Sequence, residues 1–134
     1  GFLLMHMVLG FVFAVVFQLA HIVEKTEFPR EDPDTGILDT EWAIHQLATT
    51  ADFATKSAFW TWALGGLNFQ AEHHLFPRIS HVHYPDINHI IMETCKDHDI
   101  DYLSYPTFYS ALVSHLKHLK QLGQAAPEAI EQPA

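Results

Sequence analysis

The sequence predicts an all-α fold in which one helix spans a membrane and the other helices lie outside it. The first 23 residues contain no Asp, Glu, Lys or Arg. At about 1.5 Å per residue, a helix of that length crosses a hydrocarbon core of about 30 Å. Farther along the chain, apolar residues recur at helical spacing over 87–95 and 108–119. We therefore predict the C-terminal portion of a membrane-embedded helical bundle.

The predicted span covers residues 1–23, where the polar residues are His6, Gln18 and His21. A secretory signal peptide would open with basic residues and carry a shorter apolar stretch. A buried helix of a large soluble protein is the alternative, but so long a run without charge favours the membrane. All seven Lys and Arg residues follow Val23, which predicts that the C-terminal end of the span is cytosolic. Since the chain opens inside an apolar run, we expect it to be a piece of a longer, multi-pass protein.

The segment 24–123 is predicted to be the cytosolic and interfacial part. Its first portion, 24–41, is acidic and rich in turn residues, so we expect a solvated loop. The stretch 42–67 is aromatic and too polar to span, which predicts a helix at the membrane interface. Its section 53–62 is a candidate wall of an acyl tunnel, although an interfacial aromatic belt is the simpler role.

Two amphipathic helices are predicted near the C-terminus. In the first, Ile87, Ile90, Ile91 and Cys95 form one stripe. The second runs from about 106 to 122 and ends at Gly123 as a cap. Residues 124–134 are rich in Gln, Ala, Pro and Glu, which predicts a disordered tail.

Composition narrows the possible functions. A net charge of −9 without a basic stripe argues against a nucleic-acid partner. The single Cys95 excludes an intrachain disulfide and a cysteine-based zinc site within this chain. Eleven histidines in 134 residues point instead to metal or proton chemistry.

The chemistry is concentrated in Gln70-Ala71-Glu72-His73-His74. On a helix, Gln70 shares a face with His73 and His74. The two adjacent imidazoles diverge by about 100°, because a helix has 3.6 residues per turn. One helix therefore offers nitrogen ligands to two neighbouring metal ions, although imidazole alone does not distinguish iron from zinc or copper.

The surrounding segment 65–77, GGLNFQAEHHLFP, closely resembles the third histidine box of membrane fatty acid desaturases. The match is to the subgroup in which Gln replaces the first histidine of HxxHH, as in front-end and linoleoyl-CoA-type enzymes. The resemblance continues through His83-Tyr84-Pro85 and extends over about 1–123. It implies a cytosolic helical di-iron cap on the membrane bundle.

The resemblance also implies a function: oxygen-dependent desaturation of a fatty acyl chain. The implied cofactors are two iron ions, with O2 as co-substrate. The implied partners are an acyl-CoA or acyl-lipid substrate, an electron donor such as cytochrome b5 or ferredoxin, and membrane lipid. The metal ligands implied within this chain are His21, Gln70, His73 and His74. The family's first two boxes, HxxxH and HxxHH, are not in this sequence, so we expect them upstream and expect the piece alone to be inactive.

His21 is included because it ends the apolar helix, where a histidine without a role is costly. Related desaturases carry a histidine here that completes the iron shell; the alternative is an interfacial histidine that meets water. His45 is a weaker candidate, as a group that orients a ligand. His81 and His83 are expected to be structural, and His6 lies about 22 Å from His21 along the helix. The remaining histidines are expected to be solvated: His89, His98, His115 and His118.

Three other functions remain open at this point. A hydroxylase or other oxygenase would use the same histidines, although the Gln in the third box favours a desaturase. A membrane metal-binding or transport protein would need polar residues within the span, where His6 alone qualifies. An interaction module would leave the pattern from Gln70 to His74 unexplained.

Overall fold

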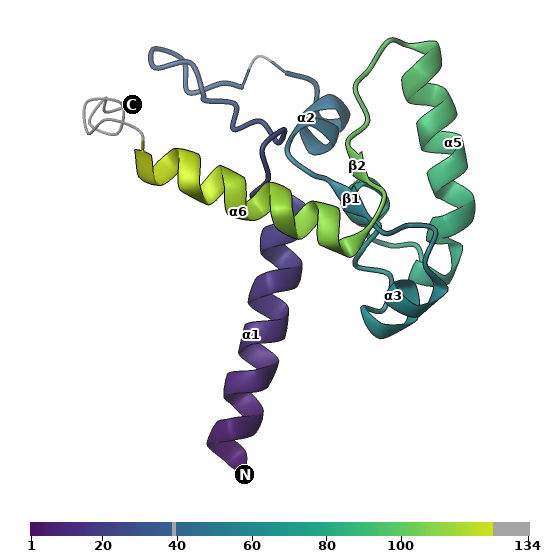
Figure 1. The fold of residues 1–134 in the computed structure, drawn as a ribbon. Coiled ribbons are helices and arrows are strands. Elements are labelled where there is room, and N and C mark those ends of the chain that lie inside the picture. The colour runs from purple at the N-terminus through teal and green to yellow at the C-terminus, as the bar shows by residue number, and fades with distance from the viewer. Residues whose placement is uncertain (39, 125–134) are drawn as a thin grey trace.

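The computed structural model describes residues 1–38 and 40–124. Over these residues the elements are mostly helical, with a short pair of strands packed among them (Figure 1). In chain order they are α1 (Phe2–His21), α2 (Trp42–Ala48), β1 (Asp52–Phe53), α3 (Ala58–Ala63), α4 (Gln70–Leu75), a 3-10 turn (His81–His83), α5 (Tyr84–Asp97), β2 (Ser104–Tyr105) and α6 (Phe108–Gln124).

Helix α1 is long and apolar enough to cross a membrane, with a mean hydropathy of 2.3 over its most apolar window. It projects away from the other elements, and α6 crosses its C-terminal end (Figure 1). Its N-terminal residues are exposed, whereas Val16, Leu19 and Ala20 near its C-terminal end are buried. Full burial of Leu19 contributes roughly 1.5–3 kcal/mol to holding this end against the rest of the molecule. The packed end is the one that carries His21.

The segment 42–67 is not the single interfacial helix that the sequence predicts. It divides into α2, β1 and α3. Helix α2 stops where the hydroxyls of Thr49 and Thr50 donate to the carbonyls of His45 and Gln46, at 2.9 and 2.7 Å. Such bonds from a side chain to the backbone compete with continuation of a helix. Helix α3 then restarts at Ser57, whose side chain accepts from the backbone N–H of Trp60.

The described residues are mostly helical, as predicted, but they include one short strand pair that the sequence did not predict. Strands β1 and β2 pair in parallel, with Asp52 opposite Ser104 and Phe53 opposite Tyr105. The pair is two residues long, too short to leave an alternating pattern in the sequence. It lies at the centre of the packing, because Phe53 joins Leu19 and Ala20 in one buried cluster.

The predicted amphipathic helix is present as α5, with Ile91 and Cys95 buried. Ile90 was predicted to lie on the same apolar stripe, but it is exposed. Helix α6 begins later and ends later than predicted, so Gly123 lies in its last turn and is not a cap. Helix ends commonly differ by such a margin, because their terminal turns are weakly specified. The predicted tail begins at Gln124, which is helical; residues 125–134 lie outside the described part of the chain.

The acidic segment after α1 is a loop over its described residues, as predicted, and most of its side chains are exposed. Two residues at its start are exceptions, since Val23 and Thr26 are buried. Here α6 meets the loop: the imidazole Nδ1 of His115 lies 2.7 Å from the carbonyl of Ile22. The prediction that His115 is solvated is therefore wrong, because a helix distant in sequence packs over the end of α1.

Candidate functional site

Three of the predicted site histidines meet in space from two elements. His21 ends α1, and His73 and His74 stand on α4. The ring centroids of His21 and His74 are 5.1 Å apart, and those of His73 and His74 are 5.7 Å apart. The planes of the two α4 rings are perpendicular to each other. The structure thus joins residues that are more than fifty positions apart in the chain.

Each of the three imidazoles uses Nδ1 in a contact with a neighbour. His21 Nδ1 lies 3.2 Å from the carbonyl oxygen of Thr49. His74 Nδ1 lies 2.8 Å from the side-chain oxygen of Gln46, and His73 Nδ1 lies 3.4 Å from the hydroxyl of Tyr84. A carbonyl or amide oxygen only accepts, so His21 and His74 carry their proton on Nδ1. Their Nε2 lone pairs are left free, which is how histidine is oriented for a metal ion.

The surroundings of His74 favour its neutral form. Burial, followed by the proximity of His21 and His73, lowers the pKa of His74 to about 4. At neutral pH this ring is therefore uncharged. A neutral imidazole is the form that binds a metal ion.

Gln70 lies beneath the histidines at the start of α4 and is 1% exposed. Its side-chain N–H donates to the carbonyl of Leu67 at 2.7 Å. Its side-chain oxygen is buried and has no hydrogen-bond partner among the described residues. An orphaned buried acceptor is costly, and a metal ion or a bound water would satisfy it.

These residues suit a metal ion as part of a ligand set. The rings present free nitrogens, and the buried oxygen of Gln70 on α4 has no hydrogen-bond partner among the described residues. Within 1–38 and 40–124, however, no three His, Cys, Asp or Glu side chains converge as a metal-binding group. Ring centroids 5.1 and 5.7 Å apart fit ligands of one ion as well as ligands of two neighbouring ions. The described residues alone therefore do not enclose a metal ion.

A second polar group is buried where one residue of α4 meets side chains from β1, α5 and the segment before β2. It consists of two carboxyl side chains, Asp52 and Glu72, each 0% exposed, together with Asn88 and Tyr102. Burial, and next the charge of Glu72, raise the pKa of Asp52 well above its usual range. Nothing in the sequence pattern identified this group as a unit. The one available signal was a lone Asp within the apolar run from Ala51 to Ala54, since a charge in such a run needs a partner.

The other histidines do not join the cluster. His45 lies on α2 with its Nδ1 buried and unpartnered among the described residues. His81 and His83 are exposed on the 3-10 turn, where the backbone of Gly66 packs against His81. His6 sits on the exposed part of α1, with Nδ1 3.0 Å from the carbonyl of Phe2.

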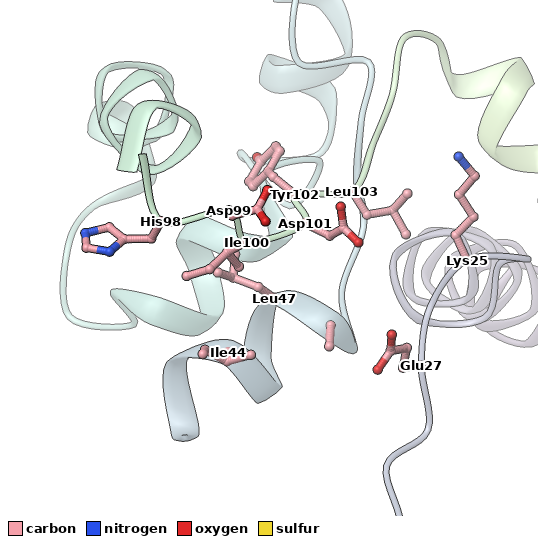
Figure 2. Close-up of a pocket in the computed structure, with 11 residues that line it drawn as sticks. Lys25, Glu27, Ile44, Leu47, His98, Asp99, Ile100, Asp101, Tyr102 and Leu103 are labelled. Carbon is pink, nitrogen blue, oxygen red and sulfur yellow. The ribbon is translucent and has the colours of Figure 1, made fainter. Parts of the chain in front are cut away.

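A separate cavity of about 600 Å³ lies between α2, the loop after α1 and the segment 98–103 (Figure 2). Lys25 and Glu27 face it from one side and Asp101 from the other. Tyr102 both lines this cavity and belongs to the buried polar group. The predicted metal ligands do not line it, so its position gives no support to a role in binding metal.

Comparison with known proteins agrees with this geometry. Residues 1–106 match the family model described as fatty acid desaturase. The chain is 46% identical over 121 residues to an sn-1 linoleoyl-lipid 6-desaturase of Synechocystis sp., covering 90% of this chain and 34% of that protein. It is 48% identical over 117 residues to an acyl-lipid (8-3)-desaturase of Physcomitrium patens, covering 87% of this chain and 24% of that protein.

An acyl-lipid (8-3)-desaturase of Mortierella alpina is 46% identical over 117 residues, which cover 87% of this chain and 26% of that protein. The chain therefore spans about a third or less of the length of these relatives. No solved structure matches it. The extent of the family match and the identity to these relatives establish that the chain belongs to the fatty acid desaturase family.

Proposed function

We propose that this chain is the part of a membrane desaturase that supplies one portion of a histidine-bound di-iron centre. The observation that carries the proposal is the meeting of His21, His73 and His74, with Nδ1 of each engaged by a neighbour. These three histidines would hold iron, and the buried oxygen of Gln70 would be a weak ligand or accept a hydrogen bond. The remaining ligands would come from the rest of the protein.

When bound, the two iron ions would supply the activation of O2 that removal of two hydrogens from an alkyl chain requires, which side chains alone cannot provide. The contribution of this chain is orientation. Thr49 and Gln46 hold the rings of His21 and His74 so that Nε2 faces the site. Partial burial excludes water from His74 and keeps it unprotonated.

The substrate is proposed to be a fatty acyl chain carried on a lipid or on coenzyme A. The names of the relatives from Synechocystis and Mortierella refer to lipid-linked acyl chains, which favours the lipid-linked form here. The apolar helix α1 would span the bilayer and place His21 at its cytosolic face. Electrons would come from a donor of the cytochrome b5 or ferredoxin type, which reaches the site from that face.

The proposal is tested by expressing the full-length protein in cells that lack the corresponding unsaturated fatty acid. A fatty acid with one additional double bond should appear in membrane lipids only when both O2 and iron are supplied. A hydroxylated fatty acid in its place would identify the alternative oxygenase. Absence of any new fatty acid, with the protein present in the membrane and binding metal, would favour a metal-binding protein without oxygen chemistry.

A further inference from the structure

The carboxylate of Asp52 lies at the junction between the strand pair and the helix of the histidine box. It is 0% exposed, and its Oδ1 accepts a hydrogen bond from the backbone N–H of Ala71 at 2.9 Å. Its Oδ2 accepts from the hydroxyl of Tyr102 and, at 3.3 Å, from the side-chain amide of Asn88. Both oxygens of one buried side chain are therefore engaged.

Helix α4 depends on this contact because it is short. It has six residues, and its N-cap, Phe69, contributes no side-chain hydrogen bond. The first backbone N–H groups of a helix have no partner within the helix and need one from outside. Asp52 supplies that partner to Ala71 from 19 positions away in the chain. A negatively charged or polar oxygen at this end also interacts favourably with the helix dipole.

The segment that contains Asp52 also contacts the end of α1, the helix that carries His21. The backbone N–H of Ala51 donates to the carbonyl of Ala20 at 2.8 Å, one residue before His21. The carbonyl of Thr49 accepts from the His21 ring. Residues 49–52 thus connect the end of α1 to the start of α4. A displacement at Asp52 would change the separation between His21 and the two histidines of α4.

We propose that Asp52 is a positioning residue of the metal centre, which caps the histidine-box helix and is held in place by Asn88 and Tyr102. The inference rests on the proposed function, because Asp52 would position the helix whose His73 and His74 are proposed to bind iron. Asp52 does not itself ligate the metal; it acts through the backbone of α4.

An ordinary core role explains these contacts less well. Glu72 is also 0% exposed and shares Asn88 with Asp52, with its Oε1 3.0 Å from the Asn88 amide. Two buried carboxyl groups in one cluster are expensive compared with an apolar core, and a polar network of this kind contributes uniqueness of geometry more than stability. Uniqueness of geometry is what a ligand-bearing helix of six residues requires.

The experiment compares Asp52→Ala and Asp52→Asn in the full-length enzyme. The asparagine oxygen still accepts from Ala71, but its NH2 group cannot accept from Tyr102 and Asn88, so Asp52→Asn should retain more iron than Asp52→Ala. Asp52→Ala should lose iron, change the iron K-edge absorption spectrum of what remains, and lower kcat by about a hundredfold, the loss typical of a misplaced reacting group. The KM for the acyl substrate should stay unchanged, because Asp52 is fully buried and acts through the backbone of α4.

Ser114→Ala is the matched control for general destabilisation. Ser114 is 4% exposed; its hydroxyl accepts from the backbone N–H of Glu24 and bonds the hydroxyl of Tyr105, and neither partner belongs to α4. This variant should lower the unfolding temperature with an unchanged iron spectrum. If Ser114→Ala loses as much iron as Asp52→Ala for the same drop in unfolding temperature, Asp52 is a core residue and the inference is overturned.

A third variant keeps the inference testable if Asp52→Ala fails to accumulate in the membrane. Tyr102→Phe leaves Asp52 in place but removes one of its donors, and it should give an intermediate change in the iron spectrum and in kcat. An unchanged spectrum and kcat in this variant would overturn the inference. An iron-free wild-type enzyme would instead refute the proposed function, so the two failures are distinguishable.

Discussion

Histidine orientation is the property on which the site depends at the residue scale. His21 and His74 donate through Nδ1 to oxygens of Thr49 and Gln46, which leaves Nε2 of each ring available to bind a metal ion. The outer partner of a metal-binding histidine sets its tautomer and ring direction. A change in the ligand and a change in its outer partner should therefore both lower the affinity for iron, but by different amounts.

His21→Gln in the full-length enzyme should be inactive and poor in iron. An interfacial histidine without a metal would tolerate Gln, which is polar and similar in size. If His21 holds iron, a lost ligand worth about 4 kcal/mol of transition-state stabilisation slows turnover roughly a thousandfold. His6→Gln is the control, on the same helix but on its exposed part, and should keep most activity. Equal activity in the two variants at equal expression would show that His21 is no ligand.

Gln46→Leu should weaken iron binding without removing a ligand. The variant deletes the acceptor 2.8 Å from His74 Nδ1, so the ring loses its fixed tautomer and direction. Loss of such an outer partner costs roughly 10- to 100-fold in metal affinity or activity. Titration of the iron-depleted enzyme with Fe²⁺ measures the affinity, and Gln121→Leu at an exposed position is the control. If the Gln46→Leu enzyme binds Fe²⁺ as tightly as wild type, Gln46 does not orient His74 for metal binding.

The residues carrying the chemistry were more predictable than the residues orienting them. Gln70, His73 and His74 are contiguous enough to form a motif, and His21 stands out at the end of an apolar run. Gln46 lies 28 positions from the histidine it contacts. No local pattern encodes such a pairing, because it depends on how α2 packs against α4.

At the scale of elements, the turn at Gly65 and Gly66 sets the direction in which the chain enters the histidine-box helix α4. The box helix follows Gly65 and Gly66, both with positive φ, at +58° and +81°. Ala at either position adopts a left-handed backbone that costs about 1–2 kcal/mol. At Gly66 an added Cβ would also lie 2.7 Å from the Cβ of His81, whereas at Gly65 it would meet nothing within 4 Å. Comparing Ala substitutions at the two glycines therefore separates the cost of backbone strain, which both carry, from the cost of the clash with His81, which only Gly66 carries.

Gly66→Ala should therefore lower the thermal unfolding temperature of the full-length enzyme more than Gly65→Ala. Both variants bear the same type of backbone strain, and only the former must displace the turn at His81. Circular dichroism of the enzyme in detergent measures both transitions. Equal unfolding temperatures would mean that the turn at His81 yields freely and does not fix the entry to α4.

The sequence predicted a helix correctly where apolar residues recur at helical spacing, as in α5. It failed where side-chain hydroxyls bond to backbone carbonyls and end a helix. The aromatic segment after Trp42 looked like one helix, yet Thr49 and Thr50 bond back to the carbonyls of the preceding turn. Strand β1 is only two residues long, and its partner lies about fifty residues away. Pairing over such a separation is set by tertiary packing, which the sequence pattern does not reveal.

At the scale of the whole molecule, the orientation of α1 relative to the membrane determines at which membrane face the histidines lie. The apolar part of α1 extends away from the packed elements, and His21 lies at its packed end (Figure 1). If α1 spans the bilayer, the histidines sit at one membrane face together with α4. The lysines and arginines all follow the span, which predicts that this face is cytosolic.

Cysteine labelling tests this topology in the full-length protein after replacing Cys95, which is buried, by serine. A thiol introduced by Glu27→Cys should react with a membrane-impermeant reagent only when the cytosolic face is accessible. A thiol introduced by Gly1→Cys should react from the opposite side. Labelling of Glu27→Cys from the extracytoplasmic side alone would reverse the topology.

The most direct measurement is gas chromatography of lipids from cells that express the full-length enzyme with His74→Ala. This change removes a proposed ligand from a half-buried position, so membrane protein should accumulate as in wild type, with the bound iron lost. We expect no unsaturated product from His74→Ala, and wild-type product from His118→Ala, which lies beside Phe28 and away from the cluster. Normal unsaturated product from His74→Ala would contradict the assignment of this histidine cluster as the catalytic iron site.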